Sequence, residues 1–383
     1  MASDDVSQRL QTIRDAGLFR SLKTVAGPQE TRVELDGRDV LLLCSNNYLG
    51  LANDERVKAA AAEAALTYGA SAGASRSVSG TMSIQIALEE SLASFKEAEA
   101  ALLFGSGYLA NIGVIGALAP EGVVLSDELN HASIVDGCRL AGAATVVYPH
   151  RDVAQLEAEL ARYAGAPLAI VTDSVFSMDG DVAPLAEIAA LATRFGAKLI
   201  VDEAHGTGCL GPGGRGALAA AGVKADAIVG TLGKALGSYG AYVACSGEIR
   251  ELLINCARSF IFATAPAPPS VAAAQAALDV LIDEPGLVDR LQANASLLRA
   301  ELAAGGLDVR SETQILPLVI GAADATVAIA EQALRDGVFA QAIRPPTVPP
   351  GSSRLRLTVM ATHTDDDIRE AADMLVRAVS AGL

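Results

Sequence analysis

Short apolar runs recur along the middle of the chain, and alanine-rich stretches with helical spacing separate them. These runs are apolar throughout rather than alternating, which is typical of strands that helices cover on both faces. From about residue 55 to about residue 285 the alternation predicts a doubly wound, mostly parallel α/β sheet. The expected strands are Val123–Leu125, Thr145–Tyr148, Leu168–Thr172, Lys198–Val201, Ala227–Val229 and Ala241–Cys245.

The two ends of the chain follow other patterns. Residues 1–25 have the spacing of an amphipathic helix, and a short β segment follows around Thr31–Leu43. Beyond a break at residues 283–286 the pattern predicts a smaller α+β domain. Its expected elements are a helix over Leu287–Ala304, strands over Gln314–Ile320 and Leu355–Val359, and a helix over Ala325–Asp336.

The length of 383 residues exceeds the size at which a single hydrophobic core usually keeps growing. We therefore expect an N-terminal helix and β segment over residues 1–45, a large α/β domain over 46–285 and a small C-terminal domain over 286–383.

Charge and hydropathy exclude several kinds of partner. The net charge is −16, from 29 basic and 45 acidic residues, whereas a nucleic-acid-binding protein needs a basic face. A single pocket can still be basic in a protein whose surface is acidic overall, so small anionic ligands are not excluded. Apolar residues make up 51% of the chain. Every stretch of eighteen residues nevertheless contains Gly, Pro, Asn, Gln or a charged residue, so we expect no membrane span. The acidic segment Met1–Asp5 does not resemble a signal peptide, which predicts a cytoplasmic protein.

The cysteines and histidines do not have the spacing of a metal site. The five cysteines form no CxxC pair, and the four histidines form no HExxH motif. We expect reduced, mostly buried thiols and no metal centre.

Three reactive side chains follow buried strands. Asp202 and His205 come directly after Leu199–Val201, and Lys234 follows Ala227–Val229 closely. Parallel strands deliver such residues to one sheet edge, where open α/β sheets bind ligands. A lysine for a Schiff base, a carboxylate for a pyridine nitrogen and an imidazole for a phenolic oxygen suit pyridoxal 5′-phosphate (PLP). An aspartate buried at a strand end without a partner would be costly, and a pyridinium N–H would supply that partner.

Other segments allow two interpretations each. Small residues in Gly105–Asn111 would let backbone N–H groups approach a phosphate, or form only a turn. His131 could stack on a flat cofactor ring, or lie exposed in a helix-capping loop. The hydroxyls and acids of Ser174–Asp181 suit ligand contacts and a polar turn equally.

Arginines crowd the C-terminal segment. Arg354 and Arg356 alternate along one expected strand and so share a face, where a guanidinium can grip a carboxylate at two points. A solvated edge strand would look similar. Arg344 precedes a proline-rich stretch, residues 345–350, which predicts a rigid loop rather than a linker.

These motifs, in this order and over nearly the whole chain, resemble those of the α-oxoamine synthases, PLP enzymes of the aspartate-aminotransferase fold type. The segments that carry the resemblance are Ser45–Leu51, Ser126–Ser133, Val175–Asp181, Val201–Gly208 and Gly230–Lys234. The resemblance implies a large PLP-binding α/β domain, a smaller C-terminal domain and a homodimer.

It also implies roles for individual residues. Lys234 would hold PLP covalently, Asp202 would face its pyridine nitrogen, His205 its phenolic oxygen, and His131 would stack on its ring. Further cofactor contacts would come from Gly107, Tyr108, Ser177, Thr231 and, across the dimer interface, Thr264. Substrate contacts are implied for Asn46 and Arg356 at the amino-acid carboxylate, and for Arg20 and Thr347 at the acyl group. His131 is also expected to contact the substrate, by a hydrogen bond to the developing oxyanion.

Within the family, residues 342–349 and 354–358 resemble the members that join L-alanine to a pimeloyl thioester in biotin synthesis. Whether coenzyme A or a carrier protein brings the acyl group stays open. The first alternative is a sibling enzyme that uses glycine and a short acyl-CoA. A catalytically silent PLP-fold binding protein is a remote one, because it would be expected to lack Lys234, Asp202 or His205. The Gly73–Gly80 loop departs from the family pattern, which leaves its contact with the acyl donor in doubt.

Overall fold

The computed structural model describes residues 5–119 and 121–382. The chain divides into two compact units. Unit 1 comprises the residues up to Ser45, the short segment Met178–Gly180, and the chain from Leu291 onward. Unit 2 comprises Asn46–Ser177 and Asp181–Arg290. The N-terminal segment therefore belongs to the same unit as the C-terminal residues, although the sequence pattern treats it as a part of its own.

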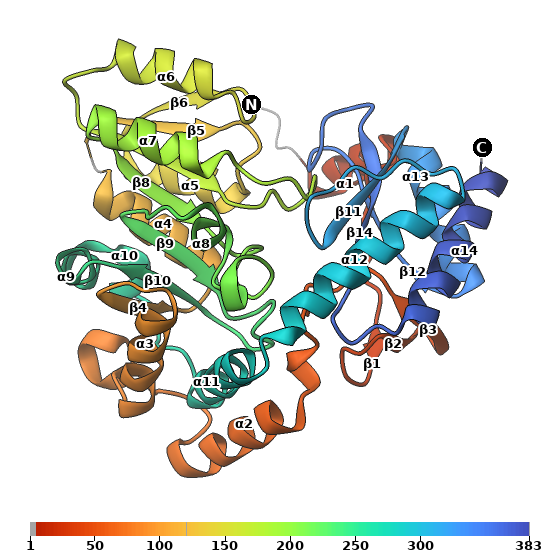
Figure 1. Cartoon of the computed structure of the whole chain (residues 1–383), viewed down its shortest axis with the longest axis horizontal. Coiled ribbons are helices and arrows are strands. Elements are labelled where there is room, and N and C mark those ends of the chain that lie inside the picture. Colours follow the sequence, from red (N-terminus) through yellow and green to blue (C-terminus); the bar gives the residue numbers. More distant parts are fainter. Residues whose placement is uncertain (1–4, 120, 383) are drawn as a thin grey trace. The chain divides into compact units, whose positions relative to one another are not determined.

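Unit 2 is built around a seven-stranded sheet with the order β4-β10-β9-β8-β7-β5-β6 (Figure 1). The strands from β9 to β6 in this order run parallel, and β10 is antiparallel to both of its neighbours. The strands are β4 (Ala100–Phe104), β5 (Val123–Asp127), β6 (Ala144–Tyr148), β7 (Leu168–Asp173), β8 (Lys198–Asp202), β9 (Ala227–Thr231) and β10 (Ala241–Cys245). The prediction of a mostly parallel, doubly wound sheet is confirmed.

Helices cover both faces of this sheet, because its central strands are apolar on both sides. On one face α4 packs against β8, β9 and β10, and the core there includes Val114, Val171, Val229 and Val243. On the other face α6 and α7 pack against β5 to β8. The helices of unit 2 are α2 (Glu55–Tyr68), α3 (Ser83–Phe95), α4 (Gly107–Leu118), α5 (Ala132–Ala141), α6 (Val153–Arg162), α7 (Leu185–Phe195), α8 (Ala217–Ala221), α9 (Gly247–Cys256), α10 (Arg258–Ile261) and α11 (Pro268–Asp283), with short helical turns η1 (Leu51–Asn53), η2 (Arg76–Gly80) and η3 (Pro212–Gly214).

Unit 1 contains two small sheets. One has the order β1-β2-β3-β12 and the other the order β11-β14-β13. The strands are β1 (Val25–Ala26), β2 (Arg32–Leu35), β3 (Arg38–Leu42), β11 (Ile315–Gly321), β12 (Val338–Phe339), β13 (Gln341–Ile343) and β14 (Ser353–Thr358). The helices are α1 (Val6–Asp15), α13 (Ala323–Asp336) and α14 (Asp365–Gly382), together with most of α12 (Gly286–Ala304).

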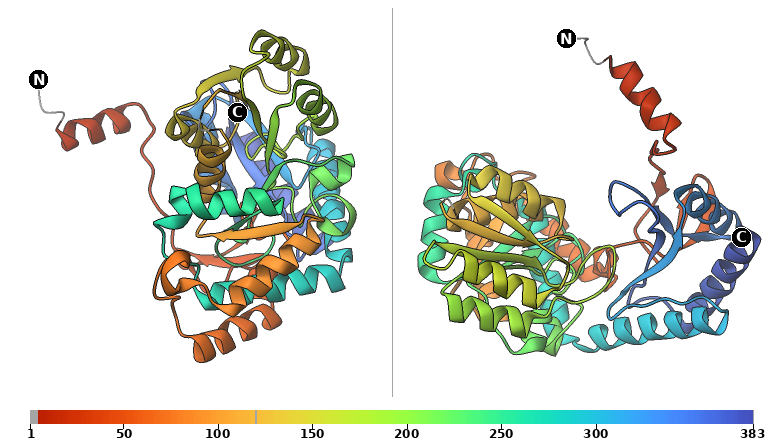
Figure 2. Two further views of the ribbon diagram at one scale, coloured as in Figure 1. Left: turned by 90° about the vertical axis from the view of Figure 1, so that its left-hand side faces the viewer. Right: turned by 90° about the horizontal axis from the view of Figure 1, so that it is seen from above.

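The predicted N-terminal helix is too long. Of residues 1–25, only Val6–Asp15 is helical, and residues 1–4 lie outside the described part. The helix ends because Gly17 takes a left-handed conformation (φ 66°), with its N–H bonded to the carbonyl of Arg14. None of the described side chains of α1 is buried, and the helix projects from the rest of unit 1 (Figure 2). The predicted β segment after it is a hairpin that turns at Asp36 and Gly37.

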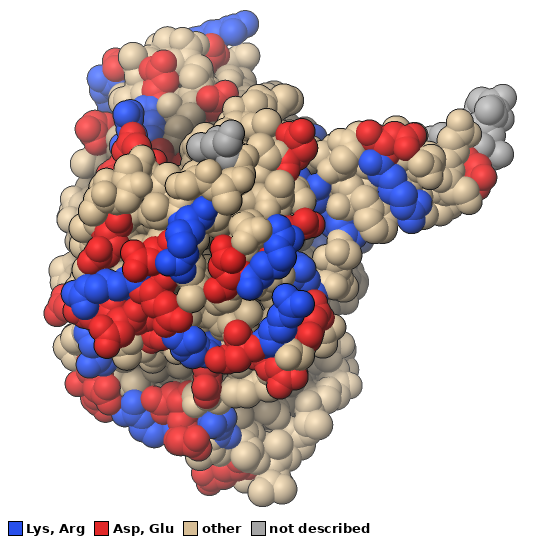
Figure 3. Space-filling view, turned by 90° about the vertical axis from the view of Figure 1, so that its right-hand side faces the viewer, with Lys and Arg blue, Asp and Glu red and all other residues tan. Residues whose placement is uncertain are grey.

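The surface in Figure 3 mixes basic and acidic side chains closely over its middle. Such interspersed charge does not provide the continuous basic area that phosphate backbones require. In the part of the chain that the structure describes, no helix has both the length and the apolar character needed to cross a bilayer.

Candidate active site

The candidate site lies at the carboxyl ends of the parallel strands of unit 2. His131 follows β5, Asp173 ends β7, Asp202 ends β8 and Lys234 follows β9. Gly107 begins α4 directly after β4. The sheet order, rather than the sequence order, makes these residues neighbours, since β7 lies between β5 and β8.

Lys234 and His205 are in direct contact. The Nζ atom of Lys234 lies 2.8 Å from Nε2 of His205, and Nδ1 of the same ring lies 2.7 Å from the hydroxyl of Tyr48. The Tyr48 hydroxyl in turn lies 3.0 Å from Oδ1 of Asn46. His205 and Tyr48 are buried. The imidazole is therefore fixed at both nitrogens, and its orientation toward the lysine amine is set by a buried partner.

Asp202 belongs to a second buried network. Its Oδ1 accepts the backbone N–H of Ala204 at 2.8 Å, and its Oδ2 accepts the side-chain amide of Asn111 at 2.7 Å. The same amide nitrogen donates to Oγ of Ser133 at 2.9 Å, and that hydroxyl lies 2.7 Å from Nδ1 of His131. Asn111 and Ser133 thus connect the carboxylate at the end of β8 to the imidazole that follows β5.

His131 is the N-cap of α5. Its Nδ1 accepts the backbone N–H of Ser133 at 3.2 Å, so a neutral ring carries its proton on Nε2. Burial, followed by the charge of Lys234, lowers the pKa of His131 against the opposing effect of Asp202. The structure agrees with the interpretation of His131 as an exposed helix cap, and the stacking of its ring on a cofactor stays a prediction.

The start of α4 offers unpaired donors. The N–H groups of Gly107 and Tyr108 lie in the first turn, where an α-helix supplies no acceptor. A Cβ added to Gly107 would lie 4.0 Å from Cβ of Thr231, so these two segments approach closely at the sheet edge. The Thr231 hydroxyl accepts the N–H of Gly233 at 3.1 Å. A helix N-terminus with a small residue and a nearby hydroxyl can receive a phosphate group.

Three further residues expected to contact the cofactor are exposed or partly buried. The Tyr108 hydroxyl donates to Asp136, and its ring meets His131 edge to face with centroids 6.5 Å apart. Ser177 is partly buried in the loop after β7. Thr264 is exposed, in a short backbone bridge with Ser75.

Sequence patterns missed several members of the site. Asp173 lies opposite Asp202 on the adjacent strand and accepts the backbone N–H of His131 at 2.7 Å. Its sequence signal is the same as that of Asp202, an acid at the end of a buried strand. Asn111, Ser133 and Tyr48 lie in segments that the sequence singles out, but no role was predicted for their side chains.

Of the expected substrate residues, Arg20, Thr347 and Arg356 belong to unit 1, and Asn46 and His131 belong to unit 2. Arg354 and Arg356 are both buried on β14, which lies between β11 and β13, so the alternative of a solvated edge strand is wrong. Arg354 binds the carboxylate of Asp179 and donates to the carbonyls of Met178 (3.2 Å) and Ser352 (3.0 Å). Arg354 is therefore fully engaged within unit 1.

Hydrogen bonds join the segment around Arg20 to the start of the proline-rich loop. Arg20 donates to the carbonyl of Pro345 at 3.4 Å, while Arg344 donates to the carbonyls of Gly17 (2.6 Å) and Phe19 (3.0 Å). The exposed Thr347 lies in the same loop as Pro345. These contacts place Arg20 beside the proline-rich loop.

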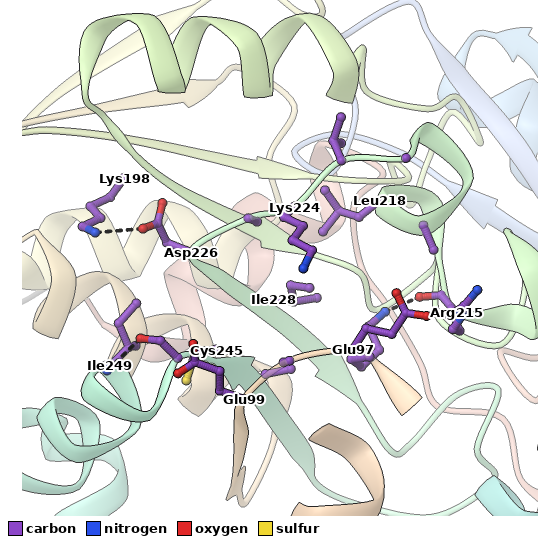
Figure 4. Close-up of a pocket in the computed structure, with 18 of the residues that line it drawn as sticks. Glu97, Glu99, Lys198, Arg215, Leu218, Lys224, Asp226, Ile228, Cys245 and Ile249 are labelled. Atoms are coloured by element: carbon purple, nitrogen blue, oxygen red, sulfur yellow. Dashed lines mark hydrogen bonds and ion pairs between the residues drawn. The ribbon is translucent and has the colours of Figure 1, made fainter. Parts of the chain in front are cut away.

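A separate cavity of about 460 Å³ lies near the amino ends of β8 and β9 (Figure 4). Charged side chains around it pair with one another: Lys198 with Asp226 at 2.8 Å, and Arg215 with Glu97. It lies at the edge of the sheet away from Lys234, so we assign the candidate active site to the carboxyl edge. No group of three or more His, Cys, Asp or Glu in the described residues could hold a metal ion.

Comparison with known proteins identifies the family of the chain. Residues 38–375 match the family described as Aminotransferase class I and II, and the chain belongs to that family. A relative from Geobacter sulfurreducens named 8-amino-7-oxononanoate synthase is 54% identical, with 97% of each chain covered. One of the same name from Geobacter metallireducens is 52% identical over 100% of this chain and 99% of its own.

Solved structures confirm the predicted fold class. A serine palmitoyltransferase from S. paucimobilis with a bound PLP–myriocin aldimine has a TM-score of 0.94 at 31% identity, covering 99% of this chain and 98% of its own. An 8-amino-7-oxononanoate synthase from Francisella tularensis has a TM-score of 0.77 at 28% identity, covering 89% of this chain and 98% of its own.

Proposed function

We propose that this chain is a PLP-dependent acyltransferase that joins L-alanine to a pimeloyl thioester, with loss of CO₂ and release of the thiol. This is the 8-amino-7-oxononanoate synthase reaction of biotin synthesis. The observation that carries the proposal is the 2.8 Å contact between Lys234 and His205 at the same edge as the buried Asp202. Relatives bearing that enzyme name at 54% and 52% identity support the choice of reaction. The cytoplasm is the location we propose.

The residues at the sheet edge fit PLP. Asp202 is a buried carboxylate suited to a protonated pyridine nitrogen, and His205 is an oriented imidazole suited to a phenolic oxygen. The first turn of α4, with Thr231 beside it, suits a phosphate. His131 would stack on the ring, and Ser177 would add a hydroxyl contact. When bound, PLP supplies an electron sink for the negative charge that develops at Cα of the amino acid.

The chain's own residues then move the protons. Lys234 would hold the cofactor, and its amine is the group that would take the Cα proton of L-alanine. His205 orients that amine through the 2.8 Å contact. His131 is kept neutral by its lowered pKa and presents Nε2–H, which can donate to the oxygen on which charge develops as the thioester is attacked.

Substrate binding is assigned by resemblance. Arg356 grips the carboxylate of alanine, with Asn46 as a second contact. Arg20 and Thr347 contact the acyl group. The hydrogen bond from Arg20 to the carbonyl of Pro345 supports this assignment, because it holds the exposed side chain of Arg20 in one position.

We also propose that the enzyme is a homodimer in which Thr264 reaches the cofactor phosphate of the partner subunit. Thr264 is exposed. Two large apolar side chains are also exposed, Phe262 at 72% and Tyr239 at 66%. Burial of such apolar side chains against a partner subunit would be favourable. Sedimentation of the purified protein would test the dimer, and a monomer that binds PLP normally would contradict it.

The function is tested by thiol release from PLP-loaded protein. L-Alanine and glycine are each offered with pimeloyl-CoA, acetyl-CoA and succinyl-CoA. Release only with L-alanine and pimeloyl-CoA is the expected result. Release with glycine and a short acyl-CoA would replace the proposed reaction by that of a sibling enzyme. If no pair reacts, a pimeloyl carrier protein is the next donor to test, before the non-catalytic alternative.

A further inference from the structure

His150, just beyond the end of β6, bridges two acids from different loops. Its Nδ1 lies 2.9 Å from Oδ1 of Asp127, and its Nε2 lies 2.8 Å from Oδ2 of Asp181. Asp127 ends β5, whereas Asp181 belongs to the loop between β7 and α7. Both ring nitrogens are thus occupied by carboxylates that are 54 residues apart in the sequence. The sequence patterns gave this histidine no role.

Both aspartates also bind loop backbone, Asp127 through its carboxylate and Asp181 through its main-chain carbonyl. Asp127 accepts the N–H groups of Leu129 and Arg151, each at 2.9 Å. The carbonyl of Asp181 accepts the N–H of Phe176 at 3.1 Å. The Phe176 ring meets the His150 ring edge to face, with centroids 4.4 Å apart. The imidazole is therefore held by packing as well as by hydrogen bonds.

The two loops held by His150 carry residues of the candidate site. Leu129, which Asp127 fixes, is two residues before His131, and Phe176 directly precedes Ser177. We infer that His150 is a positioning residue for the cofactor site, which fixes the loop carrying His131 relative to the loop carrying Ser177. The inference rests on the proposed function only for the roles given to His131 and Ser177.

The charges around His150 favour this role. Asp127 and Asp181 face its two nitrogens, Arg151 lies 3.1 Å from Asp181, and Glu128 accepts the backbone N–H of His150 at 2.9 Å. Burial lowers the pKa of His150, but the hydrogen bonds and charges of the two aspartates outweigh it and raise that pKa to about 9. At neutral pH the ring is therefore a cation that can donate to both acids at once.

The test is the affinity of the apoenzyme for PLP, measured by absorbance or fluorescence titration without any substrate. His150→Phe keeps a ring against Phe176 but removes both hydrogen bonds, and we expect its affinity to fall about tenfold. Asp181→Asn leaves the site volume unchanged and leaves His150 one carboxylate, so a smaller loss is expected. The double variant should lose no more than His150→Phe alone, because both changes break the same bridge.

The matched control is His363→Gln, which removes a buried histidine of unit 1 that accepts the N–H of Met360 at 2.9 Å. This variant should lower thermal stability without changing the dissociation constant of PLP. Wild-type PLP affinity in His150→Phe would overturn the inference. If that protein does not fold, wild-type affinity in Asp181→Asn would overturn it. Because no substrate is present, a failure of the proposed reaction would leave this result intact.

Discussion

Asp173 and Asp202 lie directly opposite each other at the ends of the parallel strands β7 and β8, and both are buried. When two buried carboxyl groups are neighbours, the negative charge on one disfavours ionisation of the other. Burial and then the charge of Asp202 raise the pKa of Asp173 well above its usual value. The pair therefore divides its roles: Asp173 favours the protonated form, and Asp202 is the member suited to a pyridine nitrogen.

This division predicts different results for two isosteric substitutions. Asp173→Asn replaces a protonated acid by a neutral group that still accepts the N–H of His131, so the turnover number should change less than about threefold. Asp202→Asn removes the carboxylate itself, and the turnover number should fall by about 10²–10³. Steady-state kinetics of both variants measure this contrast. A loss in Asp173→Asn as large as in Asp202→Asn would show that the roles are wrongly divided.

Lys234→Ala should abolish turnover and the covalent attachment of PLP. In the proposed mechanism the lysine would hold the cofactor and take the Cα proton, and an alanine side chain has no amine for either role. Mass spectrometry after borohydride reduction should find the cofactor on wild-type protein and not on the variant. A variant that retained wild-type turnover would exclude Lys234 from the chemistry.

Stability should depend on pH through His150. Its pKa is about 9 in the folded chain and roughly 6.5 in an unfolded one, so the folded state binds more protons between these values. The contribution of His150 is fully present below roughly pH 6.5 and is lost as the pH rises through about 9. Apoenzyme unfolding midpoints measured from pH 6 to 10 should fall less steeply in His150→Phe than in wild type.

His363 provides the opposite case as a control. Burial lowers its pKa to about 4, so its contribution is present above roughly pH 6.5 and is lost as the pH falls through about 4. His363→Gln should therefore leave the alkaline slope as in wild type and alter the acidic one. Equal alkaline slopes in wild type and His150→Phe would contradict the assignment to His150.

The fold was largely predictable because buried parallel strands give apolar runs that need no knowledge of their neighbours. Asp202, His205 and Lys234 were found for the same reason, since each follows such a run. The networks were not predictable, because Asn111, Ser133 and Tyr48 meet their partners only through the order of strands in the sheet. His150 was missed similarly: its acids come from the end of β5 and the loop after β7. The N-terminal helix was overestimated because helical spacing continues past Gly17, where the backbone turns left-handed.

The arginines of β14 should separate into a structural and a substrate-binding residue. Arg354 is held by Asp179 and two carbonyls, so Arg354→Lys should lower the free energy of unfolding by about 1–3 kcal/mol with little change in KM. Arg356→Lys loses a two-point grip on a carboxylate, and the KM for L-alanine should rise about tenfold. Denaturant unfolding and steady-state kinetics measure the two effects. A raised KM in Arg354→Lys together with lowered stability in Arg356→Lys would show that Arg354 binds the substrate and Arg356 is structural.

Glu203, the residue after Asp202, forms a buried ion pair with Lys96. Glu203 binds the Lys96 ammonium and accepts the N–H of Leu218 at 2.7 Å, and both charged side chains are almost wholly buried. Lys96→Met would leave the Glu203 carboxylate buried without its cation, at about 3–5 kcal/mol of stability. Lys96→Met with Glu203→Gln removes both charges while keeping an acceptor for Leu218. The double variant should therefore recover much of the loss in denaturant unfolding, because the penalty arises from the uncompensated charge. If both variants lose equally, packing of the Lys96 side chain, and not its charge, stabilises this region.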